Sequence, residues 1–324
     1  MTQSSFTRLA SSAQLHTMRV SAISILFILF LTAGCAVLTD SQIQEVNRFS
    51  KAAAAYGTLP GEPISQYGSL AKQDRVIDLA NTTLGEEGTG IKEWAQLQKA
   101  LEMENTFTSD SAKLNASLNV ITNYAEGLQE LTSKEVTDEL DKSAEELGTA
   151  LDKATKQYNE VVLKPQNKKE FGLIGGATAG AIRAAGGLFL SNRQAHYTKD
   201  FVTKADPLLS DMMGEIQSLM TRQIDRLTTQ EERIQNNFTT LFKRRKQLTP
   251  ETLLLFSHQL EVNHHAKQLA TKANDAAGAF VQAHHALKSA LENRKTLTSH
   301  IETIETLIQH IKQGLAIKDK VSKS

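Results

Sequence analysis

The sequence predicts an all-α fold, an elongated antiparallel bundle of long helices with coiled-coil character. The chain of 324 residues is rich in Ala, Leu, Lys, Glu and Gln, a composition that favours helix over sheet. Apolar residues recur at alternating spacings of three and four over long stretches, as they do on one face of a helix. No stretch alternates strictly between apolar and polar residues, as a half-buried strand would. Short breaks between the helical stretches indicate antiparallel neighbours.

Residues 35–106 are expected to form a tether and short N-terminal helices. The first helix, DSQIQEVNRFSKAAAAYG, begins at a cap on Asp40 or Ser41 and is broken by the two prolines of TLPGEPISQYG. A second helix, SLAKQDRVIDLANTTL, ends at the glycine-rich turn GEEGTG, and a third, IKEWAQLQKALEMEN, follows it. We expect this region to be distinct from a long-helix bundle formed by residues 107–324.

Two apolar helix faces open the bundle region. The first comprises Leu114, Leu118, Ile121, Ala125 and Leu128. A capping box at Thr132 and Glu135 then starts a helix that Pro165 ends. The seam of that helix comprises Leu140, Ala144, Leu147, Leu151, Ala154, Tyr158 and Val161. Spacings of this kind are typical of a helix packed along a long partner.

The C-terminal half carries two helices that start with the same signal. Asp206 and Thr249 are expected N-caps, and each precedes a proline, which suits the first helical position. The seam of the first helix comprises Met220, Ile224, Leu227, Ile234, Phe238 and Leu241. The second is expected to run from Pro250 to about Gly314, on the order of 95 Å. Its end carries a heptad series of Leu297, Ile301, Ile304, Ile308, Ile311 and Leu315.

The first 34 residues have the features of a secretory signal. Arg8 and Arg19 precede the apolar run VSAISILFILFLTAG, which ends directly on Cys35, the single cysteine of the chain. A basic segment, a short apolar segment and small residues at a cleavage point are typical of a signal peptide, and the run is too short for an ordinary spanning helix. A start at Met18 would give a more compact signal than a start at Met1.

The residues L-T-A-G-C, 31–35, resemble the lipobox of bacterial lipoproteins, in which a signal peptidase cuts before a cysteine that is then diacylated. The resemblance implies acyl chains such as palmitate on Cys35, with the membrane as a partner through this N-terminal lipid. Because Ala36 rather than Asp follows the cysteine, the enterobacterial sorting rule implies the outer membrane, and we expect the chain to face the periplasm. The alternative is an ordinary signal peptide or anchor with an incidental cysteine.

No catalytic, nucleic-acid or cofactor site is expected. The 36 basic and 36 acidic residues balance, whereas nucleic-acid binding needs a concentrated basic face. The stretch GEEGTGIK lacks the Ser or Thr of a phosphate-binding loop. Seven of the nine histidines lie beyond residue 250. Among them His265, four residues after Glu261, forms with it a weak candidate pair of metal ligands.

Residues 171–190, FGLIGGATAGAIRAAGGLFL, are expected to form a glycine zipper. One smooth helix face would carry Gly172, Gly176 and Gly180, roughly continued by Gly187, and needs a close neighbour or an apolar medium. Six glycines cost an exposed helix on the order of 6 kcal/mol relative to alanine. As a membrane span the segment is marginal, because Arg183, its single charge, costs about 2.5–3.5 kcal/mol at the bilayer centre.

Two functional hypotheses follow. In the first, the chain is a lipid-anchored scaffold or adaptor of the cell envelope that engages a protein partner, or itself, through its helices. In the second, residues 171–190 enter a membrane. The layout of long helices around an apolar glycine-rich segment then resembles the α-helical pore-forming toxins of the haemolysin BL and cytolysin A kind, although no residue motif is shared.

Overall fold

The computed structural model describes residues 38–83, 91–133, 140–173, 190–245, 247–293 and 298–321. Within these ranges almost every residue is helical and there is no strand, so the all-α helical bundle is confirmed. The described helices belong to one compact unit, Leu38–Ser324. No helix within these ranges is both long enough and apolar enough to span a bilayer.

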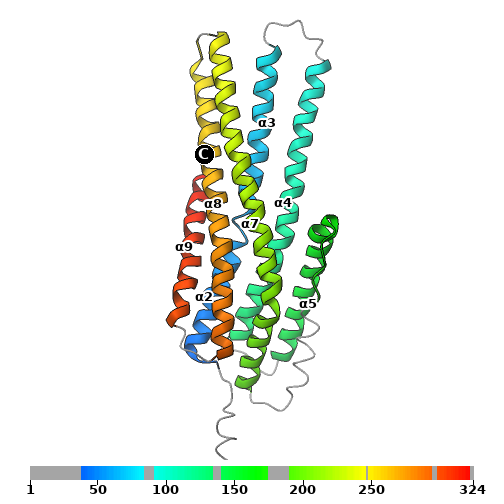
Figure 1. Cartoon of the computed structure of the whole chain (residues 1–324), viewed down its shortest axis with the longest axis vertical. Coiled ribbons are helices and arrows are strands. Elements are labelled where there is room, and N and C mark those ends of the chain that lie inside the picture. Colours follow the sequence, from blue (N-terminus) through cyan, green and yellow to red (C-terminus); the bar gives the residue numbers. More distant parts are fainter. Residues whose placement is uncertain are drawn as a thin grey trace, which may run out of the picture. The chain divides into compact units, whose positions relative to one another are not determined.

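The helices pack lengthwise against one another (Figure 1). The elements are α2 (Asp40–Tyr56), α3 (Gly61–Thr83), α4 (Ile91–Thr132), α5 (Leu140–Tyr158), a π-helical turn (Asn159–Leu163), a 3-10 turn (Lys164–Gln166), α7 (Leu190–Arg245), α8 (Pro250–Asn293) and α9 (Thr298–Val321). Helix α7 lies along α8, α3 packs against α4, α7 and α8, and α9 returns along α8. Helix α2 contacts α4, α8 and α9, and α5 covers α4.

Local signals at two helix starts explain their positions. Helix α8 begins at Pro250 as expected, and the Thr252 N–H donates to the Thr249 hydroxyl at 3.3 Å. Helix α2 is capped one residue earlier than expected, by Thr39. The Gln42 N–H donates to the Thr39 hydroxyl at 3.1 Å, and the Thr39 N–H donates to the Gln42 amide oxygen at 2.9 Å. This reciprocal capping box satisfies two free N–H groups, which neither Asp40 nor Ser41 does.

The helix start expected at Asp206 is wrong, because α7 continues through Pro207 without a break. A proline inside a helix removes one hydrogen bond and costs about 3 kcal/mol. Tertiary packing offsets this cost, since the flanking residues Val202, Ala205, Leu208 and Leu209 are all buried in the main core. Asp206 contacts another helix instead of capping its own.

The single final helix of about 95 Å is also wrong. Helix α8 ends at Asn293, and α9 starts at Thr298 and packs back along α8. Helix α8 is rich in small buried residues: Ala266, Ala270, Ala273, Ala276, Ala277 and Ala283. Small side chains allow two helices to approach closely. The reversal buries Ile304, Leu307 and Ile311 of α9, which a straight helix would leave exposed.

The expected division near residue 106 does not correspond to a boundary in the structure. Helix α4 is continuous from Ile91 to Thr132, and α2 and α3 contribute to the same core as the later helices. Phe49, Tyr56 and Leu59 from the N-terminal region are fully buried in it. The N-terminal helices are therefore part of the bundle, because their apolar faces have no other surface to cover.

The apolar seams are confirmed wherever their side chains are described. These buried positions are Leu114, Leu118, Ile121, Ala125 and Leu128 in α4, Leu151, Ala154 and Tyr158 in α5, Met220, Leu227, Ile234 and Leu241 in α7, and Ile304 and Ile311 in α9. Ile224, Phe238, Ile301, Ile308 and Leu315 are half-buried. Periodicity thus identified the inward faces correctly even where helix ends were misplaced.

A polar stripe runs along α7 inside the bundle. Gln223, Gln230 and Asn237 recur every seven residues on this helix. Gln223 donates to the Pro63 carbonyl at 3.0 Å, and Asn237 donates to the Asp74 carboxylate at 2.6 Å, so two of the three pair with α3. A second small core forms around Ile234, Leu241 and Phe256 near the turn between α7 and α8.

Candidate functional site

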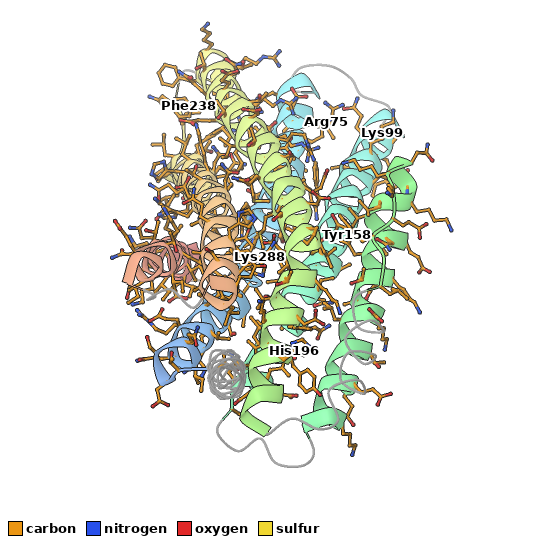
Figure 2. The ribbon with its side chains drawn as sticks, turned by 60° about the horizontal axis from the view of Figure 1, so that its bottom comes forward. Arg75, Lys99, Tyr158, His196, Phe238 and Lys288 are labelled. Carbon is orange, nitrogen blue, oxygen red and sulfur yellow. The ribbon has the colours of Figure 1, made fainter. Side chains whose placement is uncertain are left out.

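A chain of polar side chains crosses the main core and joins three helices. The Tyr124 hydroxyl of α4 lies 2.7 Å from Nε2 of His284 on α8. Nδ1 of His284 lies 2.9 Å from one carboxylate oxygen of Asp206 on α7. The other oxygen accepts from Lys288 Nζ at 2.8 Å, and Lys288 lies between α7 and α8 in Figure 2. His285 reaches the same carboxylate at 3.3 Å from the solvent side.

The electrostatics of this network indicate a neutral imidazole. Burial lowers the pKa of His284, which is 1 % exposed, and the hydrogen bond to Asp206 only partly opposes it. The hydrogen bond from His284 and the contact with Lys288 hold the pKa of Asp206 well below its usual range. The neutral ring therefore donates its Nδ1 proton to the Asp206 carboxylate and accepts the Tyr124 hydroxyl proton at Nε2.

Apolar rings cover the Tyr124–His284 end of the network, whereas Lys288 and His285 reach the surface at its other end. Phe49 of α2 and Phe280 of α8 lie 5.7 Å and 6.4 Å from the His284 ring, and Phe201 stacks on Tyr124 at 5.1 Å. Tyr124 and His284 have no surface that a substrate could touch in this conformation. The arrangement sets the positions of the helices around it, because each polar group is satisfied only when its partners on other helices are in register.

The weak metal candidates do not assemble a site. Glu261 is exposed and His265 is half-buried on α8. Within the described ranges no group of three or more His, Cys, Asp and Glu side chains is placed to hold an ion. Helix α8 continues through Gly278 without a break. The pair His264–His265 is therefore too far along the helix from the pair His284–His285 to share an ion with it.

The predicted zipper face is described only at its beginning. Gly176, Gly180, Arg183 and Gly187 lie outside the described residues. Gly172 is exposed, its backbone is not helical, and a Cβ built on it would meet nothing within 4 Å. The expected helix therefore does not start at residue 171, and none of the described residues lies close to the Cβ position of Gly172.

The backbone of Phe171, directly before Gly172, is instead hydrogen-bonded to the π-helical turn that follows α5. The Asn159 amide donates to the Phe171 carbonyl at 2.9 Å and accepts from the Phe171 N–H at 3.1 Å. Tyr158 packs against the Phe171 ring at 6.2 Å. One side-chain amide thus replaces the two hydrogen bonds of a backbone partner.

An open groove of about 910 Å³ lies between α3, α4 and α7. Arg75 on α3 and Lys99 on α4, both labelled in Figure 2, line this groove. Its charged lining consists of Asp74, Asp78 and Glu102 with Arg75, Lys99 and Arg233. These opposite charges balance, so the groove favours neither an anion nor a cation.

Exposed apolar side chains gather at the turn between α7 and α8, which sequence reasoning did not single out. Phe242 is 52 % exposed, and Leu253, Leu254 and Leu255 are 48 %, 69 % and 42 % exposed. The consecutive leucines of TPETLLLF were the available signal. A bundle helix needs apolar residues only at every third or fourth position, so three in succession exceed what the core requires.

Cys35, the expected lipid site, lies outside the described residues, three positions before Leu38. Comparison of the chain with family models, with curated proteins and with solved structures found no match in any of the three.

Proposed function

We propose that the chain is a lipid-anchored cell-envelope protein whose helical bundle acts as a scaffold and interaction module, without catalysis. The observation that carries this proposal is the L-T-A-G-C segment with the single cysteine of the chain at its end. The acylated Cys35 would hold the protein to the outer membrane, because Ala36 follows it, and the bundle would face the periplasm.

The start of the bundle supports an anchor at this position. Only four residues, 36–39, separate Cys35 from the first residue of α2. Four extended residues span at most about 14 Å, so the lipid would keep this end of the bundle close to the membrane. Leu38 is already buried against the core, which leaves little length for a flexible tether.

The rest of the bundle fits a scaffold. The Tyr124–His284 part of the polar network has no exposed surface, and it joins helices to one another. Long helices with exposed polar faces offer extended surfaces to a protein partner or to a second copy. No described residue supplies an observation that favours the pore-forming alternative over this proposal.

The anchor is tested in cells of the source organism or in a host that processes bacterial lipoproteins. Globomycin, which blocks the lipoprotein signal peptidase, should cause an uncleaved precursor to accumulate, and labelled palmitate should enter the protein. Cys35→Ser should abolish both effects. An unchanged gel band under globomycin, or equal labelling of Cys35→Ser, would refute lipidation.

Sorting and partners need two further measurements. Membrane fractionation should place the protein in the outer membrane, and Ala36→Asp, the matched control, should retain it in the inner membrane. Crosslinking in intact cells should capture a protein partner or a second copy. A strictly monomeric protein with no crosslinked product would contradict the scaffold role while leaving the anchor intact.

A further inference from the structure

The end of the α7–α8 hairpin carries a surface that the scaffold role does not use. We call it the basic–apolar tip, and it comprises Phe242, Lys243 and Arg245 of α7 with Leu253, Leu254 and Leu255 of α8. All six side chains are exposed. With Leu260 added, five of the eight large exposed apolar side chains among the described residues lie on this hairpin. Single exposed leucines are normal, but a cluster marks a contact surface.

The tip leucines are not part of the packing between the two helices. That packing is made by Ile234, Leu241 and Phe256, with Phe238 half-buried against them. The Phe238 and Phe256 rings meet edge to face at 5.2 Å, and Figure 2 shows Phe238 at this end of α7. The hairpin core is complete without the leucines, so polar residues at positions 253–255 would not weaken it.

The charge around the leucines is positive. The last turn of α7 carries Lys243, Arg244 and Arg245. Arg244 donates to the Asn81 carbonyl and so closes the end of α3, which leaves Lys243 and Arg245 pointing outward. Among the described residues from 241 to 258, the one carboxylate belongs to Glu251. A positive apolar surface repels a second copy of itself and attracts an anionic surface.

The shape of the tip favours a lipid surface over a folded protein. Successive residues on an α-helix are rotated by about 100°, so Leu253, Leu254 and Leu255 project over more than half the circumference of α8. A rigid partner would need a deep socket to contact all three, whereas fluid lipid surrounds a convex end. Lys and Arg side chains keep their charges at the headgroups while their stems lie against apolar neighbours.

We propose that the basic–apolar tip binds the surface of an anionic phospholipid bilayer. The leucines and Phe242 enter the headgroup–acyl boundary, while Lys243 and Arg245 pair with lipid phosphates. Both kinds of group are needed, because a few basic residues or a few apolar side chains alone give weak binding.

The tip lies far from the end at which α2 begins. The Gln42 amide near the start of α2 donates to the carbonyl of Ala290 on α8. Ala290 follows Pro250 by 40 residues along one continuous helix, which is about 60 Å. This step rests on the proposed function: if Cys35 carries the lipid, the tip contacts a second membrane and the protein links two bilayers.

The test uses residues 36–324, which contain the whole compact unit and lack the cysteine, so that lipidation plays no part. Flotation with vesicles of mixed phosphatidylglycerol and phosphatidylcholine should show binding. Pure phosphatidylcholine vesicles should bind at least about tenfold less protein, and high salt should have a similar effect on the mixed vesicles.

Two tip variants separate the contributions. The triple change Leu253→Ser, Leu254→Ser and Leu255→Ser, and the double change Lys243→Gln and Arg245→Gln, should each weaken binding about tenfold or more. Leu173→Ser and the double change Lys153→Gln and Lys156→Gln alter exposed residues elsewhere and should leave binding unchanged. Circular dichroism confirms that every variant is folded.

Three outcomes would overturn the proposal. Equal binding to both lipid compositions would remove the role of charge, and undiminished binding by the tip variants would place the contact elsewhere. A dimer that dissociates on the leucine substitutions, without vesicle binding, would make the tip a self-association surface. Because the protein tested has no lipid, its result is independent of whether Cys35 is acylated in cells.

Discussion

Replacing Asp206 with alanine tests whether the buried network holds the bundle together. The change removes the acceptor of the His284 Nδ1 proton at 2.9 Å and the partner of Lys288 Nζ at 2.8 Å. His284 is 1 % exposed, so its Nδ1–H loses a buried acceptor. A buried donor without a partner costs about 1–3 kcal/mol.

The other contributions to the stability change of Asp206→Ala are smaller and partly cancel. Lys288 is partly exposed and solvent compensates much of its loss, so we assign it about 0.5–1 kcal/mol. Alanine gains about 0.5 kcal/mol over aspartate inside a helix. The expected loss for Asp206→Ala is therefore about 1–3.5 kcal/mol in the free energy of unfolding. Tyr124→Phe removes one hydrogen bond of 2.7 Å and should cost about 1 kcal/mol.

The assay is urea unfolding of residues 36–324, followed by far-ultraviolet circular dichroism at pH 7. The matched control is Asp225→Ala, which removes an exposed carboxylate from the same helix and should stay within about 0.5 kcal/mol of the parent protein. If Asp206→Ala unfolds at the same urea concentration as this control, the network does not stabilise the bundle and our reasoning fails.

Three further results are expected. Because burial lowers the pKa of His284, the unfolded chain takes up a proton near pH 6.5 before the folded one does, so stability should fall as the pH drops below about 7. In His284→Gln, the free energy of unfolding measured with denaturant should fall less steeply as the pH drops. The same pH dependence as in the parent protein would contradict this. Burial raises the pKa of Asp74, so its ionised form disfavours folding above about pH 4. Asp74→Asn should raise the free energy of unfolding at pH 7 by up to about 1 kcal/mol; a lower free energy of unfolding would show that the charge of Asp74 is compensated. Gly214→Ala, with nothing within 4 Å of the new Cβ, should stabilise α7 by about 1 kcal/mol. Gly314→Ala would bring its Cβ to 2.9 Å from the buried Leu59 and should destabilise by about 1–3 kcal/mol, so equal thermal midpoints for these two variants would be inconsistent with the packing.

Much of the helix content and the inward faces could be predicted, because they depend on short-range patterns. The face containing Leu114, Leu118 and Leu128 is buried as its spacing indicated. The helix start predicted at Thr249–Pro250 is confirmed. It could be predicted because a capping side chain and the N–H that it accepts from lie only three residues apart. The same signal at Asp206 failed, because tertiary contacts gave that carboxylate a different partner.

The candidate sites divide in the same way. The lipobox before Cys35 and the consecutive leucines before Phe256 can be read from adjacent residues. The partnership of Asp206 with His284 joins residues 78 positions apart, and no local pattern relates them. Asn159 and Phe171 are closer in the chain, but the π-helical turn that aligns them has no recognised sequence signal.

By itself, the sequence determined that this chain forms long amphipathic helices and which of their faces turn inward. Those properties follow from the helical period and from capping chemistry within one turn. The tertiary structure alone decided that α9 folds back on α8, that Pro207 lies inside a helix, and that a polar stripe on α7 pairs with α3. These outcomes depend on which surfaces meet, and the free energy of burying them is large enough to override a local stop signal.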